Sequence, residues 1–348
     1  MSRIAVSESR GEVVGWLTQS RHAVHALAAA RIGVGLAVLG LLVTNFGNRQ
    51  AWVGDASLWA EPTRAVSRFP EIALLDGVSA DILTVVYVAV ILAAVAFVLG
   101  WRTKAANVLL LVGFIAVTGQ NPLLSTASDN LLRIALLWML LMRLADVWSL
   151  DAARLERPGS EQAVPEWLRT GLHNVGLLGL GTQVALAYLA AGLAKVAQPQ
   201  WQQGTALFGT LQLPEYRPFP WLSDLLSVGT VPLALVTWAV LVSQLFFVPA
   251  LVNRTTRNTV VVLAVAVNLF FGIVLGTLWS AFAVVAVTGL FLSDDLWEDL
   301  GYAVADVTAP VTDRIVDAWY ALADRVEDWW FRFVLPPVDW VRATVFRR

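Results

Sequence analysis

Long apolar stretches separated by short polar segments dominate the pattern of the chain. A helix needs about 20 mostly apolar residues to cross a bilayer, because the hydrocarbon layer is ~30 Å thick and each residue rises ~1.5 Å. Stretches of about this length run through residues 23–46, 82–100, 105–121, 129–147, 173–197, 228–252, 258–274 and 276–293. The last two are counted separately because together they are too long for one crossing, and Gly272 and Gly276 offer a place to turn. The pattern predicts an all-α membrane helix bundle with about eight transmembrane helices.

Arginine and lysine fall mainly on alternate connections between these stretches. Cytoplasmic loops of membrane proteins carry an excess of the two residues. If the N-terminus is cytoplasmic, the cytoplasmic connections hold Arg102, Lys104, Arg143, Arg154, Arg157, Arg169, Arg254 and Arg257. The outer connections hold far fewer, except the first at 47–81, where acidic residues outnumber the arginines. We therefore expect a multi-pass protein of the plasma membrane with both termini in the cytoplasm.

The same pattern divides the chain into three parts. Residues 1–22 form a cytoplasmic N-terminal segment, 23–293 the transmembrane domain and 294–348 a cytoplasmic tail. Within the tail, from Ile315 to Phe333, apolar residues that include three tryptophans recur at helical spacing, with charged residues on the other side. This pattern is typical of an amphipathic helix that lies in the membrane interface. A helix that docks a partner is the alternative.

Composition excludes several classes of function. Hydrophobic residues make up 57% of the chain and charged residues only 14%, whereas a soluble protein has roughly 25% charged residues. The net charge is −2 and no run of like charge occurs, so we expect no nucleic-acid partner. The chain has no cysteine, which excludes disulfides, thiolate metal sites and a cysteine nucleophile. Its three histidines lack metal-ligand spacing, so we expect no metal.

Four ionisable residues stand out within the predicted spans, where a charge is unfavourable by roughly 2.5–3.5 kcal/mol: Lys195, Arg31, Asp129 and Arg133. Lys195 stands one turn from the outer end of the fifth span, and Tyr188, seven positions earlier, shares its helix face. Lys195 is either a general base or a residue that extends to the outer headgroups, and spacing alone leaves both open. Arg31 lies about two turns inside the first span, and we expect a structural residue that snorkels or pairs with a group such as Asp146.

Further polar residues gather at the predicted outer ends of the spans. Asp129 and Arg133 are four apart on one face of the fourth span, either as a helix cap with an internal ion pair or as part of a site. Asn121 ends the third span, Trp201 follows the lysine, and Asn268 lies in the outer half of the seventh span. Together with Lys195 these residues predict a pocket that opens outward.

A set of short segments runs through the chain in a fixed order. The segments are Arg31-Ile-Gly33, Gly54-Asp55, Gly100-Trp-Arg102-Thr, Asn121-Pro122, Ser128-Asp129-Asn-Leu-Leu-Arg133, Trp148-Ser-Leu-Asp151 and Tyr188-x-x-Ala191-Gly192-x-x-Lys195 followed by Trp201. In this order and spacing they resemble the horizontally transferred transmembrane (HTTM) family, which is related to the membrane domain of vitamin K-dependent gamma-glutamyl carboxylases. The resemblance covers about residues 20–295.

The resemblance implies a chemistry for the lysine. In the animal carboxylase, a lysine in an alanine–glycine segment of a membrane helix deprotonates vitamin K hydroquinone, and by motif match it falls on Lys195. This implies a quinol-linked oxygenase or carboxylase-type enzyme whose cofactor is a reduced naphthoquinone of the menaquinol or vitamin K type. The sequence departs from the pattern, because Asn121-Pro122 stands where the carboxylase has a functional histidine, and Asn268 stands where bacterial members often have one. We also expect no counterpart of the carboxylase's large C-terminal extracytoplasmic domain.

These departures keep a second class of function open. The alternative is a non-catalytic membrane accessory or maturation protein for a peptide or lipid partner. A transporter is a third class, but the sequence shows neither an inverted repeat nor a pair of interrupted spans. The expected partners are the bilayer, a quinone or lipid ligand and a peptide.

Overall fold

The computed structural model describes residues 3–53, 75, 78–121, 124–152 and 164–307. Within these residues every regular element is a helix and none is a strand, which confirms the all-α prediction. The predicted amphipathic helix at 315–333, most of the first outer loop, Arg154 and Arg157 lie outside the described residues. The chain forms two compact units, Met1–Asp294 and Asp295–Arg348, and of the second the structure describes only a helical segment at 295–307.

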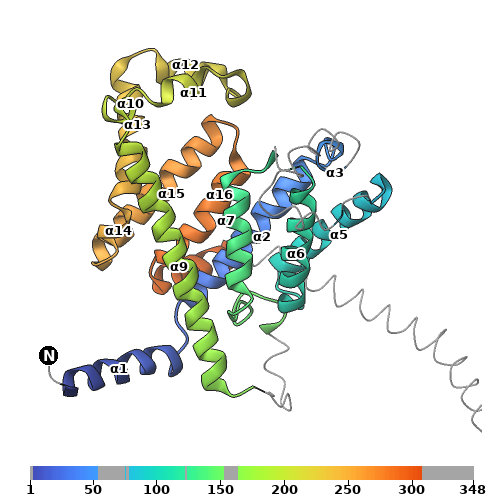
Figure 1. Cartoon of the computed structure of the whole chain (residues 1–348), viewed down its shortest axis with the longest axis vertical. Helices are drawn as coiled ribbons and strands as arrows, with labels where there is room; N and C mark the ends of the chain where they lie inside the picture. The colour runs from blue at the N-terminus through green and yellow to red at the C-terminus, as the bar shows by residue number, and fades with distance from the viewer. Residues whose placement is uncertain (1–2, 54–74, 76–77, 122–123, 153–163, 308–348) are drawn as a thin grey trace, which may run out of the picture. The chain divides into compact units, whose positions relative to one another are not determined.

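Helices lie on all the predicted spans (Figure 1). The main helices on the predicted spans are α2 (Val24–Thr44), α5 (Ala80–Leu99), α6 (Thr103–Gly119), α7 (Ala127–Met139), α9 (Glu166–Val196), α13 (Thr230–Leu245), α15 (Arg254–Val274) and α16 (Leu278–Thr288). The other elements are α1 (Arg3–Thr18), α3 (Gln50–Val53), α10 (Pro199–Gln202), α11 (Leu207–Gln212), η4 (Pro214–Tyr216), α12 (Pro220–Ser227), α14 (Phe247–Ala250) and η5 (Gly289–Phe291).

Four of the described helices, α2, α5, α9 and α15, are long and apolar enough to cross a membrane. The bent pair α12 and α13, which meet at 99°, adds a fifth if it is one span. The remaining apolar helices are shorter, and α7, with 13 residues, is only about 20 Å long. The described helices therefore establish a membrane protein, while the number of eight crossings stays a prediction.

Two predicted spans differ from the helices that the structure contains. The stretch 129–147 was expected to be one helix, but α7 ends at Met139 and the backbone N–H of Arg143 donates to Nδ1 of His173 (3.1 Å). After Met139, the apolar residues Met142 and Leu144 are buried in a loop, so their hydrophobicity reflects burial and not a helix. The stretch 228–252 is interrupted after Leu245, which is four residues before Pro249. A proline ring conflicts with the carbonyl four residues earlier, and this explains the break.

Close packing of small residues joins the central helices. α2 packs against both α5 and α16, and α15 packs against α16. A Cβ atom on Gly40 of α2 would lie 2.2 Å from the Trp279 ring of α16, so only glycine permits this approach. Gly179 of α9 packs in the same way on Trp138 of α7. Such close approach at small residues is how helices associate in lipid, where apolar burial gives no drive for association.

Arg31 is fully buried, although the sequence predicted that it would snorkel or pair with Asp146. Its guanidinium donates to the carbonyl oxygens of Phe97 (3.0 Å), Val98 (3.0 Å) and Trp148. The last carbonyls of a helix have no intrahelical partners and form the negative end of its dipole, so the end of α5 attracts a cation. The expected pairing with Asp146 is therefore wrong, and Arg31 instead links α2 to the end of α5 and to the loop after α7.

The predicted cytoplasmic charges meet at one end of the bundle. Asp146 pairs with Arg21 and with Arg143 (2.9 Å), and Glu166 pairs with Arg143 (3.3 Å) and Arg169 (3.1 Å). These residues come from the segments before α2, after α7 and at the start of α9. Three of the arginines that the sequence placed on one side of the membrane, Arg21, Arg143 and Arg169, thus lie together, and which side this is remains a prediction.

Candidate functional site

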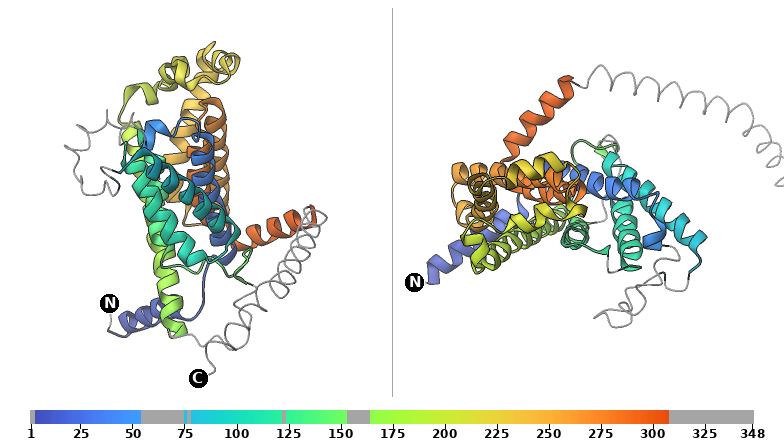
Figure 2. Two further views of the ribbon diagram at one scale, coloured as in Figure 1. Left: turned by 90° about the vertical axis from the view of Figure 1, so that its right-hand side faces the viewer. Right: turned by 90° about the horizontal axis from the view of Figure 1, so that it is seen from above.

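Lys195 lies in the last turn of α9, which runs the length of the bundle beside α13 (Figures 1 and 2). Its side chain is half-buried, and Nζ lies 5.2 Å from the centroid of the Trp201 ring. Among the described residues no carboxylate pairs with it. Pro199 begins α10 at a position that suits proline, and this short helix turns the chain so that Trp201 meets the lysine. The Lys195 amine therefore lies against an aromatic face and not against a counter-charge.

Trp201 also lines a cavity of about 690 Å³, which Lys195 itself does not line, and we call it the Trp201 cavity. Its lining residues are Gln198, Gln200, Trp201, Thr205, Ala206, Phe208, Gly209, Ser227, Val228, Gly229, Thr230 and Leu233. Trp201 also packs against a buried cluster formed by Leu207, Leu211, Leu233, Val240 and Val274. The cavity thus combines amide and hydroxyl groups with one indole face, and the apolar cluster fixes the position of that indole.

Tyr188 and Asn268 are brought together as a second group, between α9, α15 and α16. The Tyr188 ring stacks on Phe247 with 4.1 Å between the ring centroids. Its hydroxyl hydrogen-bonds with Thr288 Oγ1 (3.0 Å) and accepts from Asn268 Nδ2 (3.2 Å). The sequence predicted Tyr188 and Asn268 but missed Thr288 and Phe247. A hydroxyl inside the eighth apolar stretch was the available signal for Thr288, whereas a phenylalanine in an apolar stretch gives none.

Asp129 and Arg133 form a third group at the start of α7. The Asp129 carboxylate accepts from the backbone N–H of Thr126 (2.7 Å) and so completes a capping box. Arg133 donates to the hydroxyls of Thr118 (2.6 Å) and Ser125 (3.3 Å). The described residues thus confirm the helix cap, but the expected ion pair between Asp129 and Arg133 is not formed and that part of the prediction is wrong.

Asn121 is a buried residue just after α6, and it is close to this third group in the sequence. Its neighbour Pro122, the other half of the predicted Asn121-Pro122 segment, lies outside the described residues.

The geometry separates these groups along the bundle. α7 and α9 are antiparallel neighbours, with Gly179 against Trp138. At a rise of ~1.5 Å per residue, Lys195 lies roughly 24 Å from Gly179 along α9. Asp129 lies roughly 14 Å from Trp138 along α7, in the same direction. Lys195 therefore stands about 10 Å further along than Asp129. No hydrogen bond or ion pair in the described part of the chain joins Lys195 to Asp129, Tyr188 or their partners.

Comparison with known proteins gives one family. The model of the HTTM domain matches residues 20–297, a range that contains each of these groups and the Trp201 cavity. No curated protein and no solved structure is similar enough to the chain to match. The matched range covers well over half of the chain and includes the four described helices that are long and apolar enough to cross a membrane. The protein is therefore a membrane protein that belongs to the HTTM domain family.

Proposed function

We propose that the protein is a plasma-membrane enzyme that acts on a reduced naphthoquinone, with Lys195 as general base. The observation that carries the proposal is the placement of the Lys195 amine over Trp201, an indole that also lines a cavity. The membership in the HTTM family, which the carboxylase membrane domains resemble, supports it. The arginine distribution supports an orientation with the basic end in the cytoplasm and Lys195 toward the outer side.

The residues of the Trp201 cavity fit such a ligand. A naphthoquinol is a flat bicyclic ring that carries two hydroxyl groups. Trp201 offers an aromatic face for the ring, while Gln198 and Gln200 offer amides and Thr230 a hydroxyl for its oxygens. The volume of about 690 Å³ lies within the roughly 300–1,000 Å³ typical of small-molecule sites.

The chain's own contribution to the chemistry is a proton transfer. With a naphthoquinol bound, the neutral amine of Lys195 would accept the proton of one hydroxyl: an N–H bond would form as the O–H bond breaks, the electron pair would stay on the ligand oxygen, and Lys195 would become an ammonium group. The transfer needs the hydroxyl oxygen at roughly 2.6–3.2 Å from Nζ. The ammonium group would attract the negatively charged oxygen of the ligand. Its contact with the Trp201 indole would stabilise the cation further. Lys195 is thus both the base and the counter-charge of its product.

The other predicted site residues act at a distance from the amine. Tyr188 and Asn268 tie α9 to α15 and α16 and so fix the helix that carries Lys195. The junction between α6 and α7 contains Asp129, Arg133 and Asn121, on the same side of the bundle as Lys195, and we assign it a supporting role. We assign them positioning roles in the proposed enzyme.

Loss of the indole is expected to weaken naphthoquinol binding. The substitution Trp201→Leu removes the aromatic face, and we expect the Kd for reduced menadione, measured anaerobically by calorimetry on protein in lipid nanodiscs, to rise about tenfold. Trp221→Leu is the matched control, because Trp221 lies on α12 in the same connecting segment, is 67% exposed and does not line the cavity. Equal affinity of wild type and Trp201→Leu, or no binding by wild type, contradicts the proposed site.

A further inference from the structure

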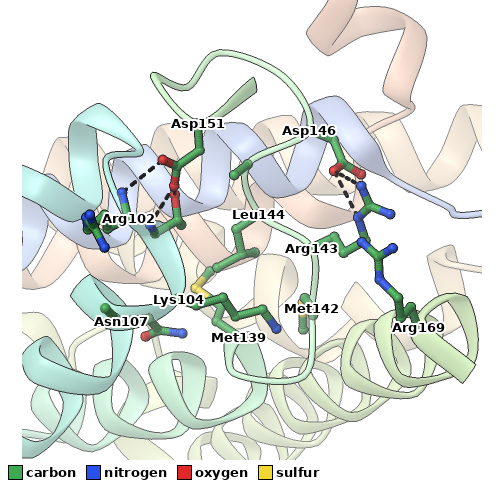
Figure 3. Close-up of a pocket in the computed structure, with 13 residues that line it drawn as sticks. Arg102, Lys104, Asn107, Met139, Met142, Arg143, Leu144, Asp146, Asp151 and Arg169 are labelled. Atoms are coloured by element: carbon green, nitrogen blue, oxygen red, sulfur yellow. Dashed lines mark hydrogen bonds and ion pairs between the residues drawn. The ribbon is translucent and has the colours of Figure 1, made fainter. Parts of the chain in front are cut away.

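A second cavity lies at the opposite end of α9 from Lys195, and we call it the basic cavity (Figure 3). It encloses about 480 Å³. The start of α6, the loop after α7, Asp151 and the first turn of α9 supply its lining residues: Arg102, Thr103, Lys104, Ala105, Asn107, Met139, Met142, Arg143, Leu144, Ala145, Asp146, Asp151 and Arg169. The cavity therefore has charged groups at its rim and apolar side chains at its floor.

Cations exceed the carboxylates that face them. Asp146 is engaged by Arg21 and Arg143, and Asp151 accepts from the backbone N–H groups of Arg102 (3.0 Å) and Thr103 (2.7 Å) at the start of α6. Lys104 donates only to the carbonyl oxygen of Leu140 (2.8 Å) among the described residues. Glu166 also pairs with Arg143 and Arg169. Five cations (Arg21, Arg102, Lys104, Arg143 and Arg169) thus meet three carboxylates (Asp146, Asp151 and Glu166), so positive charge is left for an anionic ligand.

Asn107 lies at the floor of the cavity with no partner. The residue is 1% exposed, and neither its Nδ2 nor its Oδ1 has a hydrogen-bond partner within the described structure. A buried amide without partners is unfavourable and rare in folded proteins, and it points to a ligand or water that completes it. Asn107 is three residues after Lys104, so both lie on one face of α6. A ligand in the cavity reaches an ammonium group at the rim and an amide one turn deeper.

The apolar surface continues from the cavity onto the outside of α6. Ala105 lines the cavity, and Val108, Leu109 and Val112 follow it at helical spacing, 47%, 63% and 50% exposed. At the floor, Met139 and Met142 are buried flexible side chains that adapt to an irregular ligand. The ligand that matches these surfaces carries an anionic head, polar groups just below it and an apolar tail.

We propose that the basic cavity binds the phosphodiester headgroup of an anionic phospholipid, whose acyl chains lie along the exposed apolar face of α6. The phosphate contacts Lys104 and the neighbouring arginines at the rim, and the glycerol ester oxygens and a headgroup hydroxyl complete the hydrogen bonds of Asn107. Basic pockets between membrane helices are known to hold anionic headgroups in this way. The site is separate from the Trp201 cavity and does not depend on the function proposed for Lys195.

Native mass spectrometry of the purified protein with phosphatidylglycerol or phosphatidylcholine tests this proposal. We expect wild type to retain phosphatidylglycerol about tenfold better than phosphatidylcholine, and Asn107→Leu or Lys104→Gln to lose most of that preference, since each removes a hydrogen bond to the headgroup. Lys104→Gln changes an exposed side chain, so it still tests whether the cavity binds the headgroup if Asn107→Leu fails to fold. Arg257→Gln is the matched control, because it removes a cation from the start of α15 that does not line the cavity. The proposal is overturned if wild type retains both lipids equally, or if both variants keep the preference.

A soluble anion is distinguished by a second arm. Inorganic phosphate shares the charge of the headgroup but has no tail, so we expect it to leave the unfolding temperature of the protein unchanged at concentrations where phosphatidylglycerol raises it. An equal rise with phosphate alone identifies a soluble anion as the ligand and overturns the lipid assignment.

Discussion

The substitution Lys195→Arg is expected to slow the consumption of reduced naphthoquinone by a factor of roughly 10²–10⁴, the contribution typical of a positioned general base. A guanidinium group stays protonated in proteins, so arginine cannot accept the quinol proton. It keeps a cation over the Trp201 ring, and guanidinium groups stack well on indoles. We therefore expect binding of the naphthoquinol to persist while turnover is lost. The measurement is the loss of reduced menadione with dissolved O2 as the oxidant, followed by chromatography with protein in lipid nanodiscs, after the spontaneous loss in empty nanodiscs has been subtracted.

Two comparisons make this result specific. Arg217→Gln removes another cation from the segment between α9 and α13, where Arg217 pairs with Asp224 (2.6 Å) outside the Trp201 cavity, and it is expected to leave turnover unchanged. Lys195→Gln removes the cation as well as the base, so it is expected to weaken binding in addition to turnover. Equal rates in wild type and Lys195→Arg contradict a role for Lys195 as base, even if naphthoquinol binds.

The largest expected effect on stability comes from Arg31. The substitution Arg31→Leu removes the donor that joins the carbonyl oxygens of Phe97, Val98 and Trp148; the Phe97 oxygen keeps the backbone N–H of Gly100 (3.1 Å), and the other two, which are partly buried, lose the guanidinium. Unmet buried acceptors each cost about 1–3 kcal/mol, so we expect the free energy of unfolding to fall by about 3–5 kcal/mol. Arg31→Lys is expected to lose less, because an ammonium group keeps the charge at the end of α5 but cannot span the three carbonyls. The measurement is the unfolding midpoint in detergent, followed by tryptophan fluorescence.

The control for this prediction is Arg49→Gln. Arg49 lies just beyond the other end of α2, where its guanidinium stands over the Phe46 ring (4.7 Å to the centroid). An exposed cation–π contact contributes only about 0.5–1 kcal/mol, so the midpoint is expected to change little. A similar small shift for Arg31→Leu contradicts the structural role assigned to Arg31.

The helices were predictable because each one reflects local composition. A run of apolar residues favours a helix in lipid whatever its neighbours do, so all the predicted stretches contain a helix. The ends were less predictable. Pro249 was a readable signal for the break after Leu245, but the end of α7 at Met139 depends on Arg143 and its contact with His173 from a distant segment. Such a contact has no trace in the local pattern.

The site was predictable only where its parts are close in the chain. Lys195 and Trp201 are six residues apart, and their contact needs only the turn at Pro199. The distance from Lys195 to Asp129 depends on how far α9 and α7 are shifted relative to each other along their axes. The packing of small residues sets this shift, and the spacing of residues in the sequence does not reveal it.

The basic cavity was missed because its cations were interpreted singly as loop charges. The available signal was Asn107, a polar residue three positions after Lys104 inside an apolar stretch.

The most direct test of the account is the position of a naphthoquinol bound to the protein. A cryo-electron microscopy structure of the wild-type protein in nanodiscs, prepared anaerobically with reduced menadione, places the ligand relative to Lys195. The account predicts a bicyclic ring against the indole of Trp201, with one hydroxyl oxygen roughly 2.6–3.2 Å from Lys195 Nζ. A Trp201 cavity that holds no naphthoquinol under saturating conditions, or a ligand that binds away from Lys195, contradicts it.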